Sequence, residues 1–125
     1  MMVEVRRIYD PPAEADGTRI LVDRLWPRGI ARDKAMIAHW LKALSPSNEL
    51  RKLYHGAISD ADTAWDAFVA AYTHELETGG ADIEAALAIV RDAAASGRVT
   101  LLYAARNEAR NNAVALRDWL RSRSG

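Results

Sequence analysis

The sequence predicts an α/β fold: a single, helix-rich, three-layer domain with a small, mostly parallel sheet of about three strands. Two observations predict it. Residues 99–104 are almost continuously apolar, as in a strand that helices cover on both faces. Segments with helical spacing of apolar residues alternate with strand-like segments, which is typical of α/β proteins. The length of 125 residues fits one domain, so we assign residues 1–125 to one unit and expect residues 121–125 to be a frayed tail.

Two strands are predicted near the start of the chain. Residues 3–9 alternate apolar and polar side chains, as a half-buried strand does, and end at Asp10-Pro11-Pro12. Residues 19–23 form a second, buried strand. The link between the two is short for a parallel crossover, which usually takes a dozen residues or more. The two strands are therefore either an antiparallel pair or not neighbours. Pro27 and Gly29 predict a loop over residues 24–30.

Five helices are predicted, each from a start signal and a stripe of apolar residues. The first is capped by Asp33 and carries Ile37, Trp40, Leu41 and Leu44. The second is capped by Ser45 ahead of Pro46 and ends at Gly56. The third is capped by Ser59 or Asp60 and carries Ala61, Trp65, Phe68, Tyr72 and Leu76 up to Gly79-Gly80. The fourth starts at Asp82, carries Ile83, Leu87, Val90 and Ala94, and ends at Gly97. The last carries Ala113, Leu116 and Leu120.

Composition narrows the classes of function. The chain has no cysteine, which excludes disulfides, thiolate nucleophiles and cysteine-ligated metals in this sequence. Its 17 basic and 17 acidic residues balance, so no global charge attracts nucleic acid or anionic membranes. No stretch approaches the roughly 20 apolar residues of a membrane helix, and the first residues lack the apolar core of a signal peptide. We therefore expect a cytoplasmic protein.

The candidate site lies where two strands run into arginine-bearing loops. Ligands of α/β folds bind beyond the carboxyl ends of the strands. If the two strands are parallel, the loops meet in one crevice. The residues of interest are Asp23, Arg24, Trp26, Arg28 and Arg32 in the first loop, and Tyr103, Arg106, Asn107, Arg110, Asn111 and Asn112 at the second. Arginine forks match phosphates and carboxylates, and a helix start adds partial positive charge. The pattern predicts a small anionic ligand bound by Arg24, Trp26, Arg28, Tyr103, Arg106, Asn111 and Asn112.

A purely structural interpretation stands beside this one. Arg24 can fasten loops together by pairing with Asp10, Asp16 or Asp23. Asn107 can be a helix cap, Asn111 and Asn112 first-turn residues, and Trp26 a hydrophobic plug. Charge clusters occur in both settings, so the sequence leaves both interpretations open.

Other chemistries have less support. His39, His55 and His74 lie on separate predicted elements, without the i, i+4 spacing of a helical metal site. The chain has no Gly-x-Ser-x-Gly elbow, no P-loop and no Gly-x-Gly-x-x-Gly fingerprint. We expect no metal and no cofactor. Asp23 is the one candidate catalytic residue, as a proton acceptor or a phosphate-accepting nucleophile, and whether the chain is an enzyme stays open. The alternative to ligand binding is a non-catalytic module whose arginines and tryptophan dock a protein partner; nucleic-acid binding comes third.

Several motifs resemble the family called domain of unknown function 488 (DUF488), in its short, YeaO-like branch. They are Arg7-Ile8-Tyr9-Asp10-Pro11-Pro12, the run from Asp16 to Gly29, Ser47-x-Glu49-Leu50-Arg51-Lys52, Leu101-Leu102-Tyr103-Ala104-Ala105-Arg106 and Asn111-Asn112-Ala113. The resemblance implies no assigned biochemical role. Longer relatives carry a cysteine-rich last loop, which this chain replaces with Tyr103 and Asn111-Asn112. Arg110 stands where the branch usually has a histidine, so an acid–base role for that histidine does not carry over.

Overall fold

The computed structural model describes residues 2–54 and 62–124 and contains one parallel sheet. Its four strands are β1 (Val3–Arg7), β2 (Thr18–Leu21), β3 (His39–Trp40) and β4 (Val99–Tyr103), in the order β1-β4-β2-β3. The central strand β4 pairs in parallel with β1 on one side and with β2 on the other. All five of its residues are buried, as its apolar sequence predicts. The α/β class and the parallel sheet are confirmed, with one short strand, β3, added at the edge.

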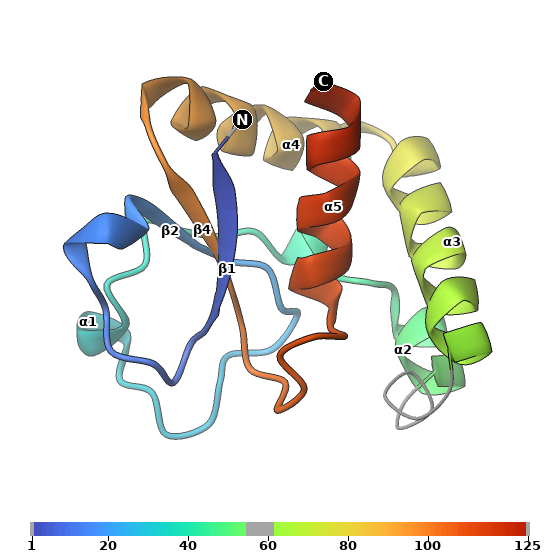
Figure 1. Cartoon of the computed structure of the whole chain (residues 1–125), viewed down its shortest axis with the longest axis horizontal. Coiled ribbons are helices and arrows are strands. Elements are labelled where there is room, and N and C mark those ends of the chain that lie inside the picture. The colour runs from blue at the N-terminus through green and yellow to red at the C-terminus, as the bar shows by residue number, and fades with distance from the viewer. Residues whose placement is uncertain (1, 55–61, 125) are drawn as a thin grey trace.

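Four helices cover one face of the sheet: α2 (Asn48–Tyr54), α3 (Asp62–Thr78), α4 (Ala81–Ser96) and α5 (Asn112–Ser124). In Figure 1, α3 and α5 lie to the right of the strands and α1 lies to the left. The larger core lies between the sheet and the four helices. It includes the predicted stripe positions Phe68, Tyr72 and Leu76 of α3 and Leu87 and Val90 of α4.

The opposite face of the sheet has a thinner cover. It consists of α1 (Arg32–Ala35), of η1 (Glu14–Asp16), and of irregular chain between them. A smaller core joins Ile8, Leu21, Ala35 and Leu102, with Trp26 and Trp40 packed against it. Successive residues of a strand point to opposite faces, so Leu101 enters the larger core and Leu102 the smaller one. The three layers are therefore unequal, with every helix longer than four residues on one side.

The chain returns from β1 to β2 without an α-helix, through the short 3-10 helix η1. Val3 and Thr18 both lie level with Val99, so residues 8–17 travel back along the whole strand length. They can do so because β1 and β2 do not touch: β4 fills the place between them. Of the two arrangements that the short link allows, the structure shows strands that are not neighbours, and they run parallel.

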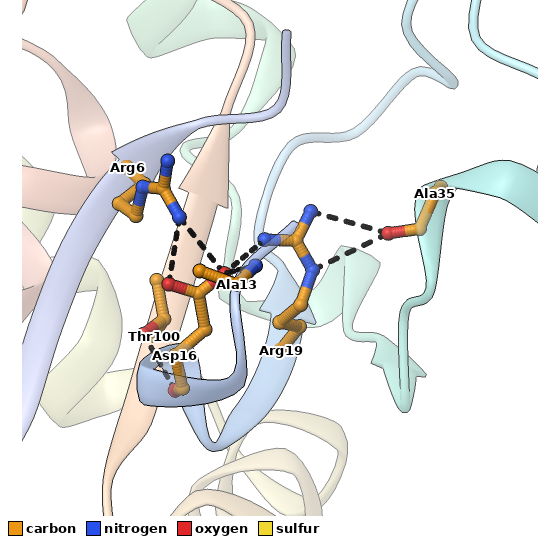
Figure 2. Close-up of polar contacts among 6 residues, drawn as sticks. All are labelled: Arg6, Ala13, Asp16, Arg19, Ala35 and Thr100. Atoms are coloured by element: carbon orange, nitrogen blue, oxygen red, sulfur yellow. Dashed lines mark hydrogen bonds and ion pairs between the residues drawn. The ribbon is translucent and has the colours of Figure 1, made fainter. Parts of the chain in front are cut away.

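Asp16 fastens the end of this return segment, as Figure 2 shows. Its carboxylate accepts hydrogen bonds from Arg19 Nη1 at 2.6 Å, Arg6 Nη1 at 2.8 Å and Ala13 N at 3.0 Å. Its carbonyl accepts one from Thr100 Oγ1 at 2.7 Å. The other nitrogens of the buried Arg19 donate to Ala35 O, which ties α1 to the sheet. This network joins the return segment, the sheet and α1 on the thinly covered face.

Gly17 follows Asp16 in a conformation that only glycine adopts without strain, with φ +65°. A Cβ placed there would lie 2.1 Å from the carbonyl oxygen of Arg98. We expect Gly17→Ala to lower the free energy of unfolding by more than about 1 kcal/mol, because positive φ and a backbone clash add. Urea denaturation measures it. Gly80→Ala is the matched control, with φ +82° and no atom within 4 Å of its Cβ. Equal losses in the two variants would contradict a role for the clash.

Two of the predicted helices differ from the structure. The helix expected from Asp33 to Leu44 is instead the single turn α1, because Met36 adopts a left-handed conformation and residues 39–40 pair with β2 as β3. Cross-strand pairing outweighs the helical spacing of Ile37, Trp40, Leu41 and Leu44. The cap of α2 is Ser47 and not Ser45: Ser47 Oγ accepts a hydrogen bond from Leu50 N, while Ser45 Oγ donates to Lys42 O in η2 (Lys42–Leu44).

The helix ends give a further correction. Residues 121–124, expected to fray, continue α5, and Arg121 Nη2 donates to Val3 O and Glu4 Oε1. Gly97 ends α4 as predicted, although with extended backbone. Predicted features at His55, Gly56, Ser59, Asp60 and Ala61 lie outside the described residues.

Candidate functional site

A cavity of about 490 Å³ lies beyond the carboxyl ends of β2 and β4. Six of the predicted site residues line it: Asp23, Arg24, Trp26, Arg28, Asn111 and Asn112. Two do not. Arg106 is exposed outside the cavity, and Tyr103 is buried in the larger core, where its side chain bonds Asn111. Parallel strands thus bring the two predicted loops together, as the sequence requires.

Asp23 joins three elements at the floor of the site. Its Oδ2 accepts a hydrogen bond from Ala104 N at 2.8 Å, and its Oδ1 accepts one from Asn112 Nδ2 at 3.1 Å. Asn112 Nδ2 also donates to Val22 O. The ends of β2 and β4 and the start of α5 are therefore fixed relative to one another. Burial raises the pKa of Asp23 more than these two hydrogen bonds and the nearby Arg51 lower it.

The two aspartates that flank β2 should titrate in opposite directions. Burial alone would raise the pKa of Asp16, but hydrogen bonds from Arg6, Ala13 and Arg19 outweigh it and hold the pKa below its ordinary value. Carboxyl ¹³C NMR should show Asp16 titrating below about 3.9 and Asp23 above it. Asp16 then stabilises the fold above the unfolded-state pKa, and this stability is lost as pH falls through its folded pKa. Asp23 does the reverse, since its folded form retains the proton to higher pH and costs stability as pH rises. If the pKa of Asp23 is not higher than the pKa of Asp16, the two environments described here are wrong.

Arg24 is held against the cavity wall by a single weak contact, from Nη2 to Pro46 O at 3.5 Å. Its Nε is buried and has no hydrogen-bond partner among the described residues. The structure gives it no ion pair with Asp10, Asp16 or Asp23, so loop fastening in the expected form is not what Arg24 does. A buried donor without an acceptor costs about 1–3 kcal/mol. Packing among residues 2–54 and 62–124 does not explain the position of Arg24 in the cavity.

Trp26 both packs in the interior and lines the cavity. It packs against the smaller core and donates from Nε1 to Ile30 O at 2.7 Å. Its ring makes an edge contact with Trp40 at 5.3 Å, and the Arg32 guanidinium lies 4.6 Å from its centroid. Arg32 therefore supports Trp26 and does not line the cavity. The two interpretations of Trp26 are compatible, because one side of the ring packs while the residue also lines the site.

The asparagines before α5 accept hydrogen bonds from backbone N–H groups. Asn107 Oδ1 accepts them from Ala109 N and Arg110 N, and Asn111 Oδ1 accepts one from Val114 N. The cap of α5 is therefore Asn111 and not Asn107, which lies in the loop before the helix, whereas Asn112 is a first-turn residue as the structural interpretation expected. Both Asn111 and Asn112 still line the cavity, which lies at the N-terminal, partially positive end of the helix.

The cavity includes residues that the sequence did not point to. They come from the start of the chain and from the helices: Tyr9, Ser45, Pro46, Arg51, Tyr54 and Phe68. Arg110 also lines the cavity, and it pairs with Asp62 at the start of α3. Arg110 was already among the residues of interest in the second loop. Local patterns carry no signal for Arg51, Tyr54 and Phe68, because the packing of α2 and α3 brings them to the strand ends. The segment from Ser47 to Lys52, which contains Arg51, was noted only as a motif of the family resemblance and was not assigned to the site.

Among residues 2–54 and 62–124, no group of three histidine or acidic side chains could hold a metal ion. Within the same residues, no helix has the length and apolar character needed to cross a membrane.

Comparisons with known proteins give a consistent family. The family model described as "Inactive DUF488-N3 subclade" matches residues 2–124. The chain is 40% identical over 122 residues to "Uncharacterized protein YeaO" of Escherichia coli, covering 98% of this chain and 99% of that protein. It is 37% identical over 121 residues to "Uncharacterized protein Rv3073c" of Mycobacterium tuberculosis, covering 97% and 95%. No solved structure gives a significant match. The motifs in the two cavity loops and a match along nearly the whole chain agree: this protein belongs to the DUF488 family, in its YeaO-like branch.

Proposed function

We propose that the protein binds a small anionic molecule in the cavity at the ends of β2 and β4. The observation that carries the proposal is Arg24, which lines the cavity and whose buried Nε has no acceptor among the described residues. An anion held by the Arg24 guanidinium would accept charge-assisted hydrogen bonds that this side chain does not make within the described part of the chain. Guanidinium groups are well suited to this because their donors form a fixed fork.

The charges around the cavity support the same ligand class. Four arginines line it: Arg24, Arg28, Arg51 and Arg110. Asp23 is the acidic residue among the described lining residues, and its raised pKa weakens the opposing charge. The N-terminal end of α5 adds partial positive charge at the same place. The protein as a whole carries no net charge, so this positive potential is local to the site.

Binding without turnover fits better than catalysis. The family model that matches the chain is described as inactive. Both carboxylate oxygens of Asp23, the candidate catalytic residue, are engaged by Ala104 N and Asn112 Nδ2. A carboxylate held in this way positions the strand ends, and each of its oxygens already accepts one hydrogen bond.

The test is calorimetry and thermal shift with inorganic phosphate, pyrophosphate, sulfate and citrate on the wild-type protein and on Arg24→Met. An anion at 100 times its dissociation constant adds about 2.7 kcal/mol to the free energy of unfolding, a shift of several degrees. We expect Arg24→Met to lose most of the binding. Arg91→Met, an exposed arginine of α4 outside the cavity, is the matched control and should bind normally. If Arg24→Met fails to fold, the exposed Arg28→Met takes its place.

Wild-type protein that binds none of these anions, nor the organic phosphates tested below, would overturn the proposal. Equal binding by Arg24→Met and the wild type would overturn it as well. A protein-docking surface is the second candidate, because Leu25 and Tyr9 line the cavity while 65% and 42% exposed. That function predicts a partner whose capture depends on Leu25 and is unaffected by anions.

A further inference from the structure

The cavity is much larger and less polar than a bare anion needs. Its volume of about 490 Å³ falls in the range of sites for small organic molecules, about 300–1,000 Å³. Besides its arginines, it is lined by Trp26, Pro27, Pro46, Tyr54 and Phe68. An inorganic ion would contact the guanidinium groups and leave the half-buried rings of Trp26 and Tyr54 without an apolar partner in the cavity. The lining therefore calls for a ligand with an apolar body as well as a charged group.

The apolar wall formed by Tyr54 and Phe68 is fixed before any ligand arrives. Phe68 stacks with Trp65 and with Tyr72, each at 5.7 Å between centroids. Tyr54 makes an edge contact with Phe68 at 6.0 Å and is half-buried. Aromatic side chains with fixed rotamers bind a flat ring with little loss of conformational entropy.

The wall formed by Trp26 and Pro27 is equally rigid. The Trp26 indole is held by its hydrogen bond to Ile30 O and by its contacts with Trp40 and Arg32. Tyr9 Oη donates to Arg28 O at 2.9 Å and links the start of the chain to this loop. Both walls are therefore held by hydrogen bonds and ring contacts within the chain.

Together these features assign a ligand class to the site. We propose that the anion it binds is a phosphate monoester joined to a flat aromatic ring, with the phosphate at the arginines and the ring between the aromatic walls. The doubly charged phosphate matches several arginines better than a single carboxylate does. This inference rests on the proposed function, since it names the kind of anion that Arg24 binds.

Isothermal titration with four probes tests it: phenyl phosphate, adenosine 5′-monophosphate, ribose 5-phosphate and adenosine. Stacking one ring on aromatic side chains contributes roughly five- to a hundredfold in affinity. We expect phenyl phosphate or adenosine 5′-monophosphate to bind at least about tenfold more tightly than ribose 5-phosphate, and adenosine to bind weakly. Whichever ring phosphate binds more tightly shows whether a nucleotide or a simpler aryl phosphate is the better ligand.

Tyr54→Leu should remove the gain that the ring provides and leave the affinity for ribose 5-phosphate unchanged. Leu53→Ala is the matched control, because Leu53 precedes Tyr54 in α2, is 76% exposed and does not line the cavity. If ribose 5-phosphate binds as tightly as both ring phosphates, the ring-binding inference is wrong while anion binding stands. If adenosine binds as tightly as its monophosphate, the phosphate is not recognised and the inference is equally wrong. If no probe binds while an inorganic anion or citrate does, this inference is wrong and the proposed function stands. If neither set of ligands binds, both fail.

Discussion

Asp16→Ala should lower the free energy of unfolding by about 3–5 kcal/mol, the usual cost of removing one partner of a buried ion pair. Asp16 and Arg19 are 4% and 5% exposed, so the guanidinium of Arg19 would remain buried without its carboxylate. Arg6 and the Ala13 N–H would lose their acceptor as well. Urea denaturation at pH 7 measures the loss.

Two further variants show whether the buried charge is the cause. Asp33→Ala, at an exposed position in α1, should change stability by no more than about 0.5 kcal/mol. The double variant Asp16→Ala/Arg19→Met should be more stable than Asp16→Ala alone, because it removes the unpaired charge along with its partner. A double variant less stable than the single one would show that Arg19 acts through its bonds to Ala35 O and not through Asp16.

Leu101→Ala should cost about 3–5 kcal/mol, in the upper part of the range for large-to-small changes in a core. Leu101 is fully buried at the centre of β4 and faces the larger core. The helices on that side are held by many contacts, so they cannot collapse into the cavity left behind. Thermal and urea denaturation of the purified variant measure the loss.

Leu102→Ala provides the comparison within the same strand. Leu102 is as buried as Leu101, but it faces the smaller core under α1 and irregular chain. That cover can relax toward a cavity more easily, so we expect a smaller cost, about 2–3 kcal/mol. A larger loss for Leu102→Ala than for Leu101→Ala would contradict the unequal layers described above.

The parts of the fold that follow from local pattern could be predicted from the sequence. The continuous apolar run of β4 and the apolar stripes of α3 and α4 each reflect the burial of a single element. The predictions for these three elements are confirmed. The helix predicted from Asp33 to Leu44 was wrong, because the apolar residues of this segment pack in two different cores. Ile37 and Trp40 pack on the smaller core, while Leu44 enters the larger one. Helical spacing cannot distinguish that division from one continuous stripe.

The candidate site, like the fold, could be predicted where it depends on the position of a residue in its own strand or loop, and not where it depends on how helices pack. Asp23, Arg24 and Asn112 directly follow strands or open a helix, and strand ends meet at one edge of a parallel sheet. Arg51 and Tyr54 come from α2, which reaches the site through the packing of that helix. Tyr103 and Arg106 were assigned by their position after the last strand, which does not say whether a side chain turns inward. Whether any of these residues binds a ligand stays a prediction.

The position of β4 has a consequence for how the chain acquires its fold during synthesis. β1 and β2 are made first, but neither has the other as a neighbour, and the strand that joins them begins only at Val99. A ribosome that has released the first 98 residues has therefore exposed no more of the sheet than the two residue pairs between β2 and β3. The apolar strands β1 and β2 stay without their main partner until β4 inserts between them. The sheet therefore closes only after Val99–Tyr103 has been synthesised, when β4 pairs with β1 and β2.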